Sequence, residues 1–394
     1  MKLHVDTTLL EAAQHILPVI QDHNEEAERE RRLSKAVLEA LTNAGLLRMC
    51  TPRSLGGLEV DPLTCARVIE EVSAADSAAG WTLVNPLDYA FFCARLPDAG
   101  AEEIYQNGPD ALIAGPFHPP MLAVAVDGGY RVSGRAPFAS NCHDATWIAR
   151  TAVVMEGDSP RLCANGEPEV RLVLVPVEDC EILDTWYVMG MRGTGSDDIV
   201  LNDVFMPAAR TFPLEPEFTP GTHYQGPLYQ CSLYGIIAAT FPLVMLAMAR
   251  QALDAVYRIV QDKTPFASTK LLRERATAQI KLAQAEATLR AARTLLYDTL
   301  HDTWEQTLAG RPPSLVQRAD LPLTVVHTTS SAAQGVELAY NVAGTSGIYT
   351  QNPLERHFRD VQVLKQHGFA AENRYEAVSQ VYFGLPLEFL PVAL

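Results

Sequence analysis

Residues 129–154, GYRVSGRAPFASNCHDATWIARTAVV, decide how this chain folds. Their first part predicts a strand, because Tyr130 and Val132 alternate with polar neighbours at the period of two that is typical of a half-buried strand. Gly134 interrupts the pattern and Pro137 removes a backbone donor, so the ladder must break or bulge there. A second β-rich run covers 147–154. The stretch therefore predicts two strands separated by a break.

The break carries the first candidate functional residues, Phe138, Ala139, Ser140 and Asn141. A flat aromatic ligand could lie on Phe138, while backbone N–H groups and the Ser140 hydroxyl form hydrogen bonds to its edge. The alternative is a hairpin turn with a core Phe and a Ser–Asn cap. The local pattern alone favours the turn.

Composition limits the possible partners. The 394 residues predict two or three domains, and the net charge of −16 argues against nucleic acid and anionic membranes, which bind clustered Lys and Arg. We expect no apolar run of the ~18–20 residues that span a bilayer, and residues 1–17 contain acidic positions that a signal peptide lacks. Seven cysteines without a C-x-x-C pair indicate reduced thiols in a cytoplasmic protein and no metal site.

The order of the elements indicates an α+β chain. We expect an N-terminal helical domain at 1–112, a central antiparallel β-barrel or sandwich domain at 113–213, and a C-terminal four-helix bundle at 214–394. The predicted strands lie at 121–126, 130–133, 147–155, 170–175 and 199–205. The predicted bundle helices lie at 232–262, at 269–309 as one helix of ~40 residues, at 324–343 and from Pro353 onward. The turn at 193–195 is not a nucleotide fingerprint, because it lacks a strand before it and a helix after it.

Three segments in this order resemble the acyl-CoA dehydrogenase superfamily over nearly the whole chain. They are residues 134–147, residues 184–207 (DTWYVMGMRGTGSDDIVLNDVFMP) and residues 343–360 (AGTSGIYTQNPLERHFRD). The first resembles the segment on which those proteins lay the flavin ring, and the third resembles their Gly-rich turn and Arg-Asp helix. The resemblance implies a homotetramer or dimer with flavin in the cleft between β-domain and bundle.

The departures from the family pattern bear on the reaction. An acyl-CoA dehydrogenase uses a carboxylate base, usually a Glu shortly after the Arg-Asp pair, but His367 and Gly368 stand there in this chain. Some relatives take the base from the first bundle helix, yet the helix predicted at 232–262 has no Glu and its two Asp residues lie late. No carboxylate is therefore evident for the dehydrogenase reaction.

The pattern is closer to the two-component flavin-dependent monooxygenases of the same superfamily, which it resembles at Gly80-Trp81, at 138–140 and in an Arg-Asp helix followed by His367. This implies reduced FMN or FAD supplied by a reductase, and a flavin hydroperoxide that oxygenates an aromatic or polycyclic small molecule. In this interpretation Ser140 is the hydrogen-bond partner of flavin N5. His367 would bind or protonate the peroxide, because imidazole titrates near neutral pH.

The resemblance and the residue types together give the predicted site. The catalytic candidates are Ser140 and His367, and the cofactor-binding candidates are Trp81, Phe138, Ala139, Ser140, Lys263, Gly344, Thr345 and Ser346. The candidate substrate pocket contains His118, Phe92, Tyr234 and Phe241. Simpler interpretations stay open: His367 as a helix cap, the aromatic residues as ordinary core, and 344–347 as a plain interhelical turn.

Three hypotheses follow. The first is a reductase-dependent oxygenase, the second an acyl-CoA dehydrogenase or oxidase with an unplaced base, and the third a flavin-fold binding module without catalysis. The missing Glu and the His367 segment favour the first. We expect a homotetramer with a transient flavin reductase partner and a small-molecule substrate, but no nucleic acid or membrane partner.

Overall fold

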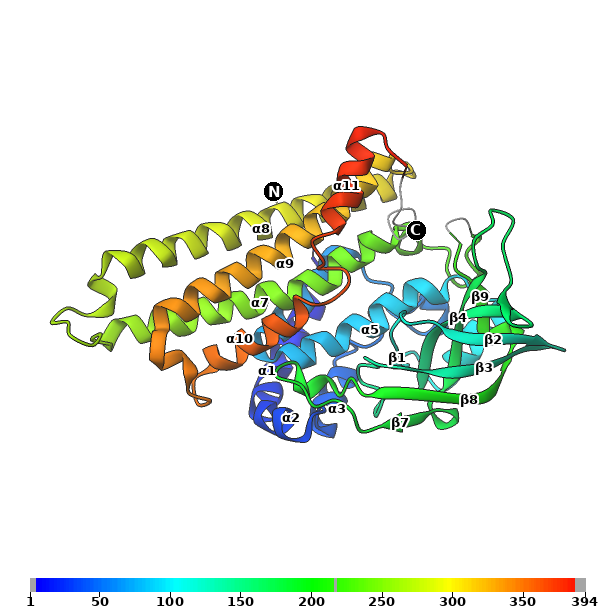
Figure 1. The fold of residues 1–394 in the computed structure, drawn as a ribbon, viewed down its shortest axis with the longest axis horizontal. Helices are drawn as coiled ribbons and strands as arrows, with labels where there is room; N and C mark the ends of the chain where they lie inside the picture. Colours follow the sequence, from blue (N-terminus) through cyan, green and yellow to red (C-terminus); the bar gives the residue numbers. More distant parts are fainter. Residues whose placement is uncertain (1–4, 216–217, 387–394) are drawn as a thin grey trace.

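The computed structural model describes residues 5–215 and 218–386, so the first four residues of the N-terminal segment lie outside it. Helices come first, strands follow and helices return, as the α+β prediction requires. In Figure 1 the long helices of the bundle lie at one end of the molecule, the sheet lies at the other, and α5 (Ser77–Cys93) runs between them. The predicted domain boundaries at 112 and 213 stay predictions.

The N-terminal block holds six α-helices in the described part of the chain. They are α1 (Thr7–Asp22), α2 (Asn24–Glu30), α3 (Lys35–Asn43), α4 (Pro62–Ala75), α5 and α6 (Asp98–Ile104). Asp76 caps α5 by accepting a hydrogen bond from the Ala79 N–H, and nearly every residue of α5 is buried. Gly80 allows α5 to lie against α4, because a Cβ at Gly80 would fall 1.8 Å from the Ser73 hydroxyl.

The sheet is mixed, which corrects the antiparallel prediction. Its main path is β7-β8-β3-β2-β4-β6-β9, and β1 and β5 pair with β4 outside that path. Both β1 and β2 run parallel to β4. The strands are β1 (Ile113–Ala114), β2 (Met121–Val126), β3 (Gly129–Ala136), β4 (Trp147–Glu156), β5 (Ser159–Pro160), β6 (Val170–Pro176), β7 (Glu181–Leu183), β8 (Asp198–Pro207) and β9 (Thr211–Pro213).

The segment between β3 and β4 explains the mixed pairing. These two strands are not neighbours, because β2 lies between them, so residues 137–146 cross from one side of β2 to the other. The hairpin alternative is therefore wrong. The predicted irregularity at Gly134 is confirmed, since the β3–β8 register shifts between Val132 and Gly134. Because of this crossing, residues 138–141 belong to no strand of the sheet, and they lie next to α5.

The C-terminal block contains the four predicted bundle helices and one more. They are α7 (Leu233–Asp262), α8 (Ala276–Leu308), α9 (Leu315–Ala343), α10 (Pro353–Leu364) and α11 (Arg374–Phe383), of which α11 was not predicted. α8 has 33 residues rather than ~40, because a 3-10 turn at Leu272–Glu274 precedes it. By length and composition α7 could cross a membrane, contrary to expectation, but 94% of its most apolar stretch is buried among its neighbours, as in a core helix.

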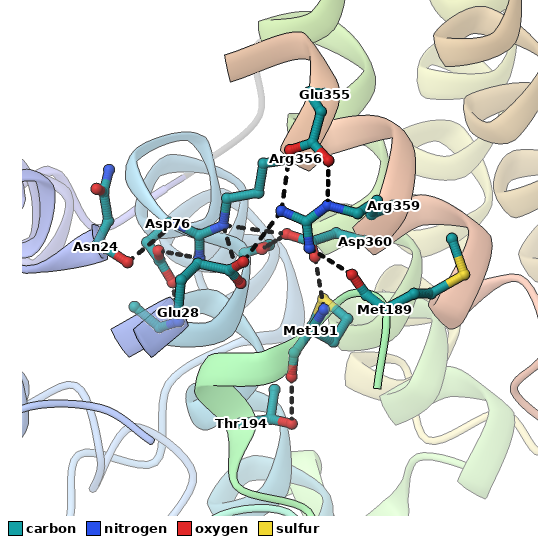
Figure 2. A network of polar contacts seen from close by, with 12 residues as sticks. Asn24, Glu28, Asp76, Met189, Met191, Thr194, Glu355, Arg356, Arg359 and Asp360 are labelled. Atoms are coloured by element: carbon teal, nitrogen blue, oxygen red, sulfur yellow. Dashed lines mark hydrogen bonds and ion pairs between the residues drawn. The ribbon is translucent and has the colours of Figure 1, made fainter. Parts of the chain in front are cut away.

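One buried network fixes the parts that surround the site (Figure 2). The Asp360 carboxylate of α10 accepts hydrogen bonds from the Ser77 hydroxyl (2.6 Å) and the Met191 N–H (2.5 Å). Arg356, one turn earlier, lies 3.5 Å from Asp360 and 2.6 Å from Asp76. The Arg-Asp helix thereby connects the start of α5 to the loop that enters β8. The Arg-Asp pair of α10 therefore has a structural role, and its presence needs no catalytic explanation.

Close packing accompanies the network. A Cβ at Gly190 would lie 2.5 Å from the Arg359 carbonyl carbon, so only glycine lets this loop touch the backbone of α10. Arg359 in turn donates to the Met189 carbonyl and pairs with Glu28 of α2 (3.1 Å). α10 therefore holds three separate segments against it: α2, the start of α5 and the loop at 189–191.

Removal of the Asp360 carboxylate should destabilise the fold. Asp360→Ala leaves the Met191 N–H without a partner in the interior and removes one of the carboxylates beside Arg356, so we expect a loss of about 3–5 kcal/mol in the free energy of unfolding, measured by urea titration. The matched control is Asp254→Ala, which removes a half-exposed helix-surface pair with Arg250 and should cost less than about 0.5 kcal/mol. Equal losses in the two variants would contradict the account.

Candidate active site

A cavity of about 1990 Å³ lies between the sheet, α5, α7 and the segment that follows α10. One face of α5 lines it with Trp81, Asn85, Asp88 and Phe92, which recur at three- and four-residue spacing. Loops at 115–118, 138–140 and 186–196 form the sheet side, and 362–369 close the other side. Apolar walls with a few polar groups are typical of a small-molecule site.

Ser140 is the first of three hydroxyl groups that are linked by hydrogen bonds, and each of them donates to the next. The Thr194 hydroxyl donates to the Met191 carbonyl (2.8 Å), so it accepts from Ser196 (2.6 Å). Since Ser196 has then used its proton, it accepts from Ser140 (2.8 Å). The Trp81 Nε1–H donates to the Ser140 oxygen (3.0 Å), because an indole nitrogen only donates. Ser140 keeps a lone pair for the cavity and has no proton left to give.

The backbone around Ser140 is already satisfied, which corrects one expectation. The Ala139 N–H donates to the Asp197 carbonyl (3.1 Å) and the Ser140 N–H to the Phe138 carbonyl (3.0 Å), so neither is free for the edge of a ligand. Phe138 has φ +66° and is 60% exposed at the cavity, with Trp186 edge-on at 6.1 Å. Phe138 is therefore exposed at the cavity, where the Ser140 hydroxyl rather than backbone N–H groups is available to a ligand.

His367 lies among aromatic rings on the opposite wall. Its ring centroid is 5.5 Å from Trp81 and 4.9 Å from Phe241. Its Nδ1 accepts a hydrogen bond from the Phe369 N–H (3.3 Å), so the proton of the neutral ring sits on Nε2. Burial lowers the pKa of His367 to about 4, which corrects the expectation of a ring that titrates near neutral pH. The ring is a neutral hydrogen-bond donor, not a cationic helix cap.

Asp88 is a cavity carboxyl that the sequence did not indicate. It lies on α5 two turns beyond Trp81, about 10 Å along the helix axis, and accepts a hydrogen bond from the Thr240 hydroxyl (3.0 Å). Burial raises its pKa to about 7. A single Asp in an apolar helix gave no local signal. Thr194 and Ser196 were missed as well, although both lie in the quoted segment 184–207.

The other predicted residues fall into two groups. Phe92, His118 and Phe241 line the cavity, whereas Ala139 is buried behind it and Tyr234 packs edge-on against Phe369 at 5.6 Å. Four of the cofactor-binding candidates form a cluster of their own, in which Lys263 donates to the Ala343 carbonyl (2.6 Å) beside Gly344, Thr345 and Ser346. We call it the phosphate cluster, because a lysine and the donors of such a turn suit the phosphate of a flavin nucleotide.

The phosphate cluster is remote from the cavity within one chain. Lys263 follows the end of α7, 22 residues beyond Phe241, which corresponds to about 33 Å along the helix. Figure 1 shows this end of α7 on the side away from the sheet. A flavin held at Ser140 cannot reach Lys263 of the same chain.

One cluster in the described part of the chain has metal-ligand chemistry, namely Cys142, His143 and Asp197. Its carboxylate already accepts hydrogen bonds from the Thr185 and Trp186 N–H groups, each at 2.7 Å, and pairs with His143 at 2.7 Å. These bonds give Asp197 a structural role: they fix the residue that directly precedes β8 to the segment at 185–186 and to His143.

Comparisons with known proteins agree with this architecture. Residues 7–106 match the acyl-CoA dehydrogenase N-terminal domain and residues 239–372 the acyl-CoA dehydrogenase C-terminal domain. The chain is 31% identical to the indole-3-acetate monooxygenase of Pseudomonas putida, over 91% of this chain and 89% of that protein. It is 29% identical to the FADH(2)-dependent resorcinol hydroxylase, oxygenase component, of Rhizobium sp. (strain MTP-10005), over 87% and 85%. The structure of 3-HSA hydroxylase from Rhodococcus sp. RHA1 shares the fold, with TM-score 0.88 and 24% identity over 98% and 99%.

The protonation state of His367 can be measured directly. Because burial holds its pKa at about 4, its ring nitrogens should show the neutral Nε2–H form in nitrogen NMR spectra throughout the neutral range and change only as the pH falls toward 4. His367→Gln identifies the resonance by removing it. A midpoint near 6.5, the ordinary histidine value, would contradict the assignment.

Proposed function

The chain belongs to the acyl-CoA dehydrogenase superfamily as a flavin-dependent monooxygenase, and we propose that it is the oxygenase component of a two-component system. It receives reduced FMN or FAD from a separate reductase. With dioxygen it oxygenates an aromatic or polycyclic small molecule. When bound, the reduced flavin would supply the oxygen chemistry, and the residues of this cavity would hold and orient it.

The observation that carries this proposal is the direction of the Ser140 hydrogen bonds. A reduced flavin has a proton on N5, whereas an oxidised flavin has a lone pair there. Since Ser140 offers only an acceptor to the cavity, it complements the reduced form. An acceptor at this point also stabilises a ring that keeps its N5 proton during the reaction. The hydroxyl chain therefore favours delivery of the cofactor in reduced form.

The remaining residues orient the reactants and exclude water. The His367 Nε2–H supplies one neutral donor on the wall that carries Phe241. Trp81 fixes Ser140 and separates it from His367 with its ring. The aromatic walls keep water away from the reacting centre, which limits the loss of activated oxygen as peroxide. The aromatic side chains that line the cavity are consistent with a substrate that is itself aromatic.

The remote phosphate cluster supports the assembly that we propose. Because Lys263 and the turn at 344–346 lie too far from Ser140 in one chain, a second copy would have to bring this cluster to the phosphate of a bound flavin. We therefore propose a homotetramer in which sites are shared between copies. The seven unpaired cysteines support our further proposal of a cytoplasmic location.

Loss of the Ser140 hydroxyl should uncouple oxygen use from oxygenation. After anaerobic mixing with reduced flavin and then with oxygen, Ser140→Ala should release hydrogen peroxide roughly five- to tenfold faster than the wild type, because one hydrogen bond to the reduced ring is lost. Ser133→Ala, which changes an exposed serine of β3, is the matched control and should behave as the wild type. Equal peroxide release in all three proteins would remove Ser140 from the mechanism.

The direction of the hydroxyl chain predicts a second effect. In Ser196→Ala the Ser140 proton has lost its acceptor and can turn into the cavity, where it suits the lone pair of an oxidised flavin. The ratio of dissociation constants, oxidised over reduced flavin, should therefore fall at least about fivefold. Equilibrium titrations with both flavin forms measure it, and an unchanged ratio would show that the chain does not select the redox state.

A further inference from the structure

We propose that Asp88 recognises the substrate, by accepting a hydrogen bond from a hydroxyl or a ring N–H on an aromatic molecule. This inference deepens the proposed function and rests on it. It names the class of ligand, a planar ring with a hydrogen-bond donor, and the residue that selects it.

The position of Asp88 leaves one oxygen open to the cavity. Its Oδ1 accepts a hydrogen bond from the Thr240 hydroxyl at 3.0 Å, and this single proton is shared with the Ile236 carbonyl at 3.2 Å. Its Oδ2 has no hydrogen-bond partner among the described residues, yet the side chain is half-buried and lines the cavity. A carboxylate oxygen in apolar surroundings needs a donor, and here only the cavity can provide one.

No cation compensates Asp88 within the described residues. Its pKa is raised to about 7 by burial, and the Thr240 hydrogen bond only partly offsets this. The Tyr89 hydroxyl is directed away to the Gly115 carbonyl, and Arg150 is bound to the Pro116 and Pro119 carbonyls. The titratable groups on the other elements that line the cavity are His118 before β2, His367 after α10, Arg374 at the start of α11, and Cys163, Glu167, Glu169 and Glu215 beside β6 and β9. Tyr89 lies on α5 itself, and Arg150 lies on β4 behind the 116–119 loop.

The surroundings of Asp88 suit an aromatic ring. Phe92 and Phe117 approach each other at 4.7 Å, and Tyr89 lies 5.7 Å from Phe117. On α7, Thr240 is followed directly by Phe241, whose ring lies 4.9 Å from His367. A ring that donates to Asp88 is therefore directed along Phe241 toward the wall that carries His367.

The same geometry predicts which ligands are rejected. An aromatic molecule whose hydroxyl or ring nitrogen is methylated has the same shape but leaves the Asp88 oxygen unpaired. A site with a buried acceptor binds an analogue without a hydrogen-bond donor much more weakly, because the acceptor then loses its hydrogen bond.

Binding without turnover tests this directly. We would measure dissociation constants by equilibrium dialysis under anaerobic conditions, with reduced FMN and reduced FAD in parallel, for phenol against anisole and for indole against 1-methylindole. The wild type should bind the donor of each pair roughly 10- to 100-fold more tightly. In Asp88→Asn that ratio should fall to about threefold or less, while Glu167→Gln, which changes another cavity carboxyl, should keep it.

Two further readouts make the outcome decisive. Thr240→Val leaves the Asp88 carboxyl in place without its hydrogen bond, so it should keep a donor preference even if Asp88→Asn folds poorly. In the wild type the preference should decrease as the pH is lowered from about 8 to about 6, because a protonated Asp88 is a weaker acceptor.

An equal ratio in wild type and Asp88→Asn, or no preference in the wild type, would overturn the inference. Failure of reduced flavin to bind at all would instead overturn the proposed function, so the two failures are distinguishable.

Discussion

The Asp360 carboxylate is the constraint on which the site depends. It is fully buried and would be costly there without partners, but each of its oxygens accepts a hydrogen bond and Arg356 lies beside it. Through Ser77 it sets the start of α5, and through Met191 it sets the loop that leads into β8. α10 itself then directs the chain toward His367. One buried carboxylate therefore ties together two of the elements that line the cavity, α5 and the loop that leads into β8; Figure 2 shows its contact with the loop.

The chemistry follows from what these walls present. The hydroxyls that begin at Ser140 run in one direction, because the last of them donates to a carbonyl that cannot donate in return. This turns a serine, which could donate or accept, into an acceptor at the cavity. His367 is the converse, since burial keeps it neutral and Phe369 fixes its proton on Nε2. The cavity is thus offered an uncharged acceptor at Ser140 and an uncharged donor at His367.

Sequence patterns predicted the parts of the fold that depend on local residues. The bulge at Gly134 and the starts of α7 and α10 follow from periodicity and from glycine and proline, which act within a few residues. The start of α8 was predicted seven residues too early, because no glycine or proline stands there, and the start of α9 was predicted nine residues too late. The antiparallel prediction was wrong for β2 and β4, which pair in parallel, because their pairing depends on where residues 137–146 cross the sheet, and no local pattern encodes that. His367 was identified by resemblance, but its pKa depends on rings that are distant in sequence. Asp88 was missed because its importance comes only from the cavity around it.

The central claim is that a reduced flavin ring lies against Phe138 with its N5–H donating to Ser140. A crystal structure of the protein with reduced flavin, prepared and cooled without oxygen, tests this most directly. The account predicts N5 about 3 Å from the Ser140 oxygen, with His367 on the side of the reactive carbon. A ring bound elsewhere in the cavity, or a carboxylate placed over the ring in position to remove a substrate proton, would contradict it.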